Sequence, residues 1–118
     1  MHDTQFKRSS LGSRRLGEHP LLGGVALAPV VRVTVDGREL HGVAGEPLAA
    51  LLLAHGIVTL RTMPGSAAPR GLFCGVGRCA DCLMTVDGEL NVRACATPVR
   101  ADMQVETQHG LGVWKADR

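Results

Sequence analysis

Four cysteines are the residues of this sequence whose type and spacing could do chemistry. They are Cys74, Cys79, Cys82 and Cys95, and they follow the spacing C-x4-C-x2-C-x12-C. Cysteines that form a disulfide framework are usually distributed along a small secreted chain, whereas these lie together. Clustered, reduced thiols are typical of a cytosolic protein that binds metal. The pattern therefore predicts a metal site built from these four thiols and a cytoplasmic location.

The spacing favours a diiron cluster over a zinc ion. Structural zinc sites usually draw on two well-separated C-x2-C pairs, and here only Cys79 and Cys82 form one, so a structural zinc-binding module stays as an alternative. A C-x4-C-x2-C run followed by a distant cysteine is the arrangement of plant-type [2Fe-2S] clusters. With its four thiolates such a cluster carries about −2 charges, which inward-facing backbone N–H groups must screen. Gly75, Gly77 and Ala80 are small enough to let the backbone wrap around it.

Other interpretations of the same segment fit less well. Residues 75–80 match the G-x-G-x-x-A dinucleotide fingerprint, but they lack the preceding strand and the long following helix of a βαβ unit. A Rieske-type cluster needs two histidine ligands, and none of the five histidines lies in the cysteine loop. A catalytic thiolate needs a neighbouring base, which is also missing there. We therefore expect no catalytic site in this chain. Arg78 is expected either to screen the cluster, to contact a partner, or to be exposed without a role.

Size and composition exclude several classes of function. The chain has 118 residues, enough for one small domain, and its formal net charge of +2 is too small to indicate a polyanion partner. With two Phe, one Trp and no Tyr, it offers no stacking platform for single-stranded nucleic acid. No apolar run reaches the ~18 residues that would span a bilayer. We expect a soluble protein that binds no nucleic acid and has no membrane span.

Residues 1–29 are predicted to be an N-terminal extension that is partly disordered or bound to a partner. Within it, Arg14-Arg15 and the apolar run LLGGVALA resemble a twin-arginine export signal. Glu18 and Pro20 interrupt that pattern. A cryptic export signal is therefore the alternative interpretation of this segment.

Two β-hairpins are predicted, one on each side of the cysteine loop. In residues 30–43, valines alternate with polar residues before Asp36-Gly37, and residues 83–92 have a similar turn at Asp87-Gly88. An Asp-Gly pair between two such runs is a strong hairpin signal, because the primed turn needs positive φ and glycine accepts it without strain.

The remaining segments predict one helix, a loop and a last strand. EPLAALLLAHG, residues 46–56, predicts a helix that starts at Pro47 and packs Leu51 and Leu52 on the sheet. TLRTMPGSAAPRG, residues 59–71, is rich in Pro and Gly and predicts a loop. MQVET, residues 103–107, predicts a strand, and GLGVWKADR an open tail. We therefore predict an α+β fold with a mixed sheet packed on a helix, in a domain of residues 30–108 followed by a C-terminal tail, residues 109–118.

The block PRGLFCGVGRCADCLMTVDGELNVRACATPV, residues 69–99, resembles the small [2Fe-2S] subunits of heteromeric bacterial amino-acid and amine dehydrogenases and oxidases. This group includes the gamma subunit of D-hydroxyproline dehydrogenase, opine oxidases, hydrogen cyanide synthase and the N-terminal segment of the sarcosine oxidase alpha subunit. The resemblance extends from about residue 30 to about residue 107. It implies a β-grasp, ferredoxin-like fold. It also implies that Cys74 and Cys79 bind one iron, and Cys82 and Cys95 the other.

The resemblance further implies an electron-transfer role beside larger flavoprotein subunits that carry FAD or FMN and oxidise a small amine or amino acid. A freestanding [2Fe-2S] ferredoxin for an oxygenase or reductase is the alternative. Two departures from free ferredoxins favour the subunit. The fourth cysteine follows after only twelve residues, and the chain is slightly basic, with a pI near 8.5. A free ferredoxin docks through a strongly acidic surface, and a permanent subunit needs no such electrostatic steering.

Overall fold

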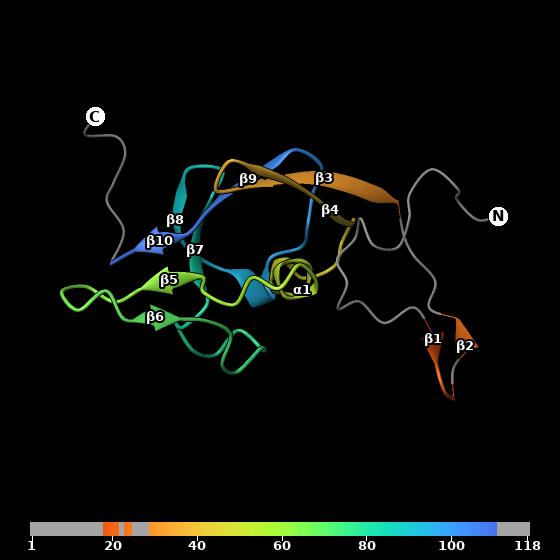
Figure 1. Ribbon diagram of the computed structural model, residues 1–118, viewed down its shortest axis with the longest axis horizontal. Coiled ribbons are helices and arrows are strands. Elements are labelled where there is room, and N and C mark those ends of the chain that lie inside the picture. The colour runs from red at the N-terminus through yellow and green to blue at the C-terminus, as the bar shows by residue number, and fades with distance from the viewer. Residues whose placement is uncertain (1–17, 22, 25–28, 111–118) are drawn as a thin grey trace.

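The computed structural model describes residues 18–21, 23–24 and 29–110 (Figure 1). A five-stranded sheet has the order β4-β3-β9-β7-β8, and a three-stranded sheet has the order β10-β5-β6. A separate two-stranded hairpin joins β1 (Glu18–His19) and β2 (Gly23–Gly24). Within these described residues, no helix is long and apolar enough to cross a membrane.

Both predicted hairpins are confirmed. The first joins β3 (Val30–Val35) to β4 (Arg38–Val43), and the second joins β7 (Leu83–Val86) to β8 (Glu89–Arg93). Each Asp-Gly pair has positive φ at both residues, 49° and 84° in the first turn and 52° and 84° in the second. These are the signs that a primed turn requires.

The predicted last strand, β9 (Met103–Glu106), is also confirmed and lies between the two hairpins. It runs parallel to β3 and antiparallel to β7, so the sheet is mixed. The aspartate of each turn fastens this strand. The Asp36 carboxylate accepts a hydrogen bond from the Thr107 amide at 2.8 Å, and the Asp87 carboxylate accepts one from the Gln104 amide at 2.8 Å. The turn residues therefore shape the hairpins and also dock β9.

The helix α1 (Leu48–Ala54) starts one residue later than predicted. Pro47 is the N-cap with φ −60° and ψ 138°, not the first helical residue. The tertiary structure explains the difference, because the Leu48 amide donates to the Thr97 carbonyl at 2.8 Å and Pro47 forms an isolated β-bridge with Pro98. These contacts hold Pro47 in an extended conformation.

The core lies between α1 and the large sheet, as the predicted α+β, β-grasp fold requires. Leu51 and Leu52 are fully buried there, which confirms their predicted orientation. Cys82 is also fully buried and belongs to the same cluster of apolar side chains. One end of the cysteine loop is therefore fixed in the core.

Residues 59–71 differ from the prediction of a loop without strands. They contain β5 (Arg61–Thr62) and β6 (Pro69–Arg70), which pair antiparallel. The strand β10 (Gln108–His109) then pairs with β5 in parallel. Sequence periodicity does not reveal strands this short, and the pairing of β5 with β10 joins residues 61 and 108, which are 47 residues apart in the chain. The strand β10 also spans the predicted boundary between domain and tail, while Arg14-Arg15 and residues 111–118 lie outside the described residues.

Candidate metal centre

The structure brings the four cysteines together from two neighbouring segments. Cys74 and Cys79 lie in the loop between β6 and β7, Cys82 immediately precedes β7, and Cys95 lies in the 3-10 helix η2 (Ala94–Ala96) that follows β8. In the second hairpin Leu83 is opposite Arg93, and the Ala94 amide donates to the Cys82 carbonyl at 3.1 Å. The twelve residues between Cys82 and Cys95 are therefore one antiparallel hairpin that returns the chain to its starting point.

The four thiols are close enough to interact. The Cys79 thiol interacts electrostatically with Cys74, and both Cys82 and Cys74 interact with Cys95. No group of three His, Cys, Asp or Glu side chains that could hold a metal ion occurs in the described part of the chain. A [2Fe-2S] cluster takes two cysteine ligands at each iron, and this chain has the four cysteines that one cluster requires.

Five backbone amides point at these sulfur atoms, which confirms the expected inward-facing N–H groups. Three of them donate to Cys74 Sγ. The distances from this sulfur are 3.4 Å to the Val76 nitrogen, 3.3 Å to the Arg78 nitrogen and 3.4 Å to the Cys79 nitrogen. The Gly77 amide donates to Cys95 Sγ at 3.2 Å, and the Asp81 amide to Cys79 Sγ at 3.5 Å. Amide donors of this kind stabilise negative charge on sulfur.

This electrostatic setting is visible in the thiol pKa values. Hydrogen bonds from the amides of Val76, Arg78 and Cys79 lower the pKa of Cys74 from 9.0 to about 6. Burial, followed by the hydrogen bond with Cys82, raises the pKa of Cys95. The amides of the loop therefore favour the thiolate form of Cys74, whereas burial disfavours the thiolate form of Cys95.

Two glycines of the loop have backbone conformations that other residues rarely adopt. Gly75 has φ 73° and Gly77 has φ 79°. A Cβ on Gly75 would meet nothing within 4 Å, and one on Gly77 would meet only the Ala96 Cβ at 3.7 Å. The glycines are therefore needed for their positive φ, which turns the following amides inward, more than for close approach.

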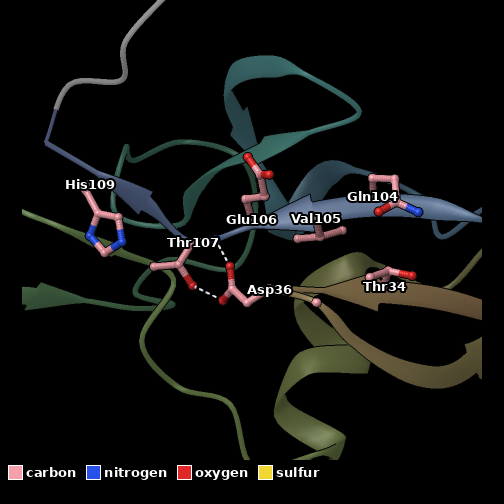
Figure 2. A pocket seen from close by; sticks show the side chains of 8 residues that line it. Thr34, Asp36, Gln104, Val105, Glu106, Thr107 and His109 are labelled. Atoms are coloured by element: carbon pink, nitrogen blue, oxygen red, sulfur yellow. Dashed lines mark hydrogen bonds between the residues drawn. The ribbon is translucent and has the colours of Figure 1, made fainter. Parts of the chain in front are cut away.

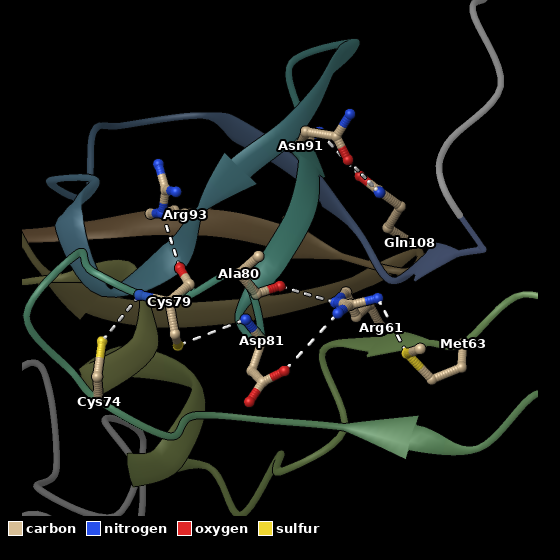
Figure 3. Close-up of polar contacts among 9 residues, drawn as sticks. All are labelled: Arg61, Met63, Cys74, Cys79, Ala80, Asp81, Asn91, Arg93 and Gln108. Atoms are coloured by element: carbon tan, nitrogen blue, oxygen red, sulfur yellow. Dashed lines mark hydrogen bonds and ion pairs between the residues drawn. The ribbon is translucent and has the colours of Figure 1, made fainter.

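Two arginines that sequence reasoning missed donate hydrogen bonds to backbone carbonyls of the loop (Figure 3). Arg61 Nε donates to the Ala80 carbonyl at 2.9 Å, and Arg93 Nε donates to the Cys79 carbonyl at 2.8 Å. Nothing in the sequence separates Arg61 from the other basic residues of the chain. Arg93 stands in the block of residues 69–99 but carries no local signal of its contact.

The outer surface of the loop is apolar and exposed. Phe73 is 79% exposed and Val76 is 71% exposed, although both flank Cys74. Leu72, the residue before Phe73, is also exposed. Val58 is exposed as well, and its carbonyl oxygen would lie 2.2 Å from a Cβ on Gly71, so it lies close to the start of this segment. Arg78 is exposed in the same loop, and its backbone amide has the described contact with Cys74. We call Val58, Leu72, Phe73 and Val76 the loop surface.

A hollow in the surface lies at the end of β3 and β9 (Figure 2). Its lining includes Asp36, Thr107 and His109. The Asp36 carboxylate accepts hydrogen bonds from both the backbone amide and the side-chain hydroxyl of Thr107, as the dashed lines show. His109 Nδ1 forms a hydrogen bond with the Thr62 hydroxyl at 3.1 Å. These contacts fasten β9 and β10, so we assign this hollow a structural role.

Comparison with known proteins finds one matching family, two similar curated proteins and a similar solved structure. The family described as "2Fe-2S iron-sulfur cluster binding domain" matches residues 28–110. The hydrogen cyanide synthase subunit HcnA of Pseudomonas aeruginosa is 40% identical over 77 residues, which cover 64% of this chain and 72% of the relative. The HcnA subunit of Pseudomonas protegens is 33% identical over 76 residues, covering 64% of this chain and 70% of that one.

Among solved structures, the chain is similar to L-proline dehydrogenase from P. horikoshii. The TM-score is 0.60 and the sequence identity 30%. The alignment covers 70% of this chain but 16% of the dehydrogenase chain. The likeness therefore concerns one small part of that larger polypeptide.

Proposed function

Because the chain belongs to the family of 2Fe-2S iron-sulfur cluster binding domains, we propose that Cys74, Cys79, Cys82 and Cys95 hold one [2Fe-2S] cluster. We assign Cys74 and Cys79 to one iron, and Cys82 and Cys95 to the other. The observation that carries the proposal is the set of five amide N–H groups directed at the sulfurs of Cys74, Cys79 and Cys95. An iron–sulfur centre held by four thiolates is anionic and needs such donors.

The proposed role is electron transfer. When bound, the cluster supplies a one-electron redox centre. The residues of this chain hold it and screen its charge with backbone amides, and exposed side chains lie next to Cys74 in the loop. The hairpin β7–β8 and the buried Cys82 fix the inner edge to the core.

We further propose that the chain is one subunit of a cytoplasmic complex, and that its partner is a larger flavoprotein subunit carrying FAD or FMN. The substrate class would be a small amino acid or amine, of the D-hydroxyproline, opine or sarcosine type. Two observations support this. The curated relatives are subunits of a hydrogen cyanide synthase, and the solved relative is a dehydrogenase. The loop surface is also a concentration of exposed apolar side chains next to the thiols, as an interaction site would be.

The cluster assignment is tested on anaerobically purified protein. We expect about two irons and two acid-labile sulfides per chain, with visible absorbance. Single Cys→Ser variants at each of the four positions should reduce the iron content and the absorbance. Bound zinc in a colourless protein would contradict the assignment. An unchanged spectrum after Cys95→Ser would remove that residue from the ligand set.

The subunit assignment is tested separately, by purifying the tagged chain from its native host. We expect it to elute with a larger protein that contributes flavin absorbance and reduces the iron–sulfur centre when an amino acid is added. Elution of the iron-loaded chain alone would instead indicate a freestanding ferredoxin. Subcellular fractionation of the same cells tests the cytoplasmic location.

A further inference from the structure

Arg61 is the buried charged residue of the described part of the chain, and its position in the small sheet is unexpected. The residue is 9% exposed on β5, between β10 and β6. A guanidinium group that leaves water must recover its lost hydration through hydrogen bonds or ion pairs. The hydrogen-bond and ion-pair partners of Arg61 therefore indicate its role.

Its two oxygen partners lie in the cysteine loop, not in the small sheet around it. Nε donates to the Ala80 carbonyl at 2.9 Å, and the guanidinium lies 3.7 Å from the Asp81 carboxylate. A third, weaker contact joins Nη1 to Met63 Sδ at 3.5 Å. Figure 3 shows the Arg61 side chain extended toward the two loop residues.

The geometry of one peptide unit links this contact to the sulfurs. The Ala80 carbonyl and the Asp81 amide belong to the same peptide, which is trans, so the C=O and the N–H point in opposite directions. Arg61 binds the Ala80 carbonyl on the side of this peptide that faces away from Cys79 Sγ. The amide on the other side is directed at Cys79 Sγ, 3.5 Å away.

We infer that Arg61 is a positioning residue for the candidate metal centre: by holding the Ala80 carbonyl, it keeps the Asp81 N–H directed at Cys79 Sγ. The effect on the reduction potential rests on the proposed [2Fe-2S] function. A hydrogen bond to a cysteine sulfur stabilises the reduced, more negative state of such a centre. Loss of the Arg61 contact should therefore shift the reduction potential to a more negative value.

Loss of the positive charge near the cluster would also shift the potential to a more negative value, so the experiment must separate charge from hydrogen bonding. Three substitutions do so. Arg61→Gln keeps a nitrogen donor at the place along the side chain that Nε occupies and removes the charge. Arg61→Lys keeps the charge but puts a methylene at that place. Arg61→Met removes both. The matched control is Arg70, the exposed cross-strand neighbour of Arg61 in β6, with the same three substitutions.

The first measurement is a redox titration of the loaded protein followed by electron paramagnetic resonance. We expect the Arg61→Gln potential to stay near that of the wild type, and Arg61→Lys and Arg61→Met to shift to more negative values. The Arg70 variants should not shift. The reverse order, with Arg61→Lys near the wild type and Arg61→Gln shifted, would overturn the inference and assign the effect to charge.

The second measurement uses the purified chain before any cluster is loaded. Hydrogen exchange of the Asp81 amide, followed by NMR, should be slow in the wild type and Arg61→Gln and faster in Arg61→Lys and Arg61→Met. Equal exchange rates in all four proteins would overturn the positioning role. Wild-type protein that takes up no iron would overturn the proposed function, while the exchange rates would still decide the role of Arg61.

Discussion

At the scale of single residues, the cysteine loop depends on backbone conformation more than on space. The sequence indicated that small residues let the chain approach the sulfurs. The structure shows that a Cβ on Gly77 would make only an ordinary contact, whereas its φ of 79° is strained for any other residue. The amide of Gly77 reaches Cys95 Sγ at 3.2 Å, so it connects the loop to the second segment of the site.

Gly77→Val should shorten the lifetime of the bound cluster and leave the hairpins intact. A β-branched residue at this φ costs on the order of 1–2 kcal/mol and turns the amide away from Cys95. The measurement is the decay of visible absorbance in air, compared with far-ultraviolet circular dichroism. Gly37→Val is the matched control, because Gly37 has a similar φ of 84° with nothing within 4 Å of its Cβ position. Equal decay rates in the two variants would contradict the special role of Gly77.

At the scale of elements, the second hairpin sets the distance between the two segments that carry cysteines. Its register places the residues next to Cys82 opposite those next to Cys95. The bulge between Met84 and Val86 lies toward the far end of the hairpin, so the pairing beside the cysteines stays regular. The hairpin thus acts as a spacer of fixed length, which explains why twelve residues are enough between these two cysteines.

The contact between α1 and β4 has no room for a side chain at Gly42, which lies on β4. A Cβ on Gly42 would lie 2.1 Å from Leu51 Cδ1 and 2.8 Å from Glu46 Oε2. Gly42→Ala should therefore lower the free energy of unfolding by about 1–3 kcal/mol, because Leu51 is fully buried and has little room to move.

Urea unfolding measures this effect, and a double-mutant cycle supplies the control. In a Leu51→Ala background the clash with Leu51 is absent and only the close contact with the Glu46 carboxylate is left, so Gly42→Ala should cost much less there than in the wild type. Additive costs would show that the destabilisation comes from the strand backbone and not from the helix contact.

At the scale of the whole molecule, the sheet, helix and small sheet together leave the cysteine loop on the surface with an apolar rim. Phe73 and Val76 are among the most exposed large apolar side chains of the described residues. Such a patch beside a redox site is typical of an interface, and aromatic anchors usually carry much of the binding energy.

Phe73→Ser combined with Val76→Ser should leave iron content unchanged and weaken binding to the proposed flavoprotein partner on the order of tenfold or more. Flavin absorbance that elutes with the tagged chain measures the complex. Gln104→Ser, in the hollow of Figure 2 on β9, is the control and should not change it. If the double variant retains full flavin absorbance, the loop surface is not the interface.

The sequence by itself determined the features that depend on neighbouring residues. These are the Asp-Gly turns, the alternating strands, the helix within residues 46–56, and the grouping of thiols with small residues. The reason is that turn geometry and hydrophobic periodicity are local properties. The assignment of all four cysteines as ligands stays a prediction.

Only the tertiary structure decided the contacts between residues far apart in the chain. Arg61 and Ala80 are 19 residues apart, and β10 pairs with β5 across more than forty residues. The late start of α1 likewise follows from the bond between Leu48 and Thr97. Such contacts arise when packed elements bring polar groups together, and no local pattern encodes a partner that distant.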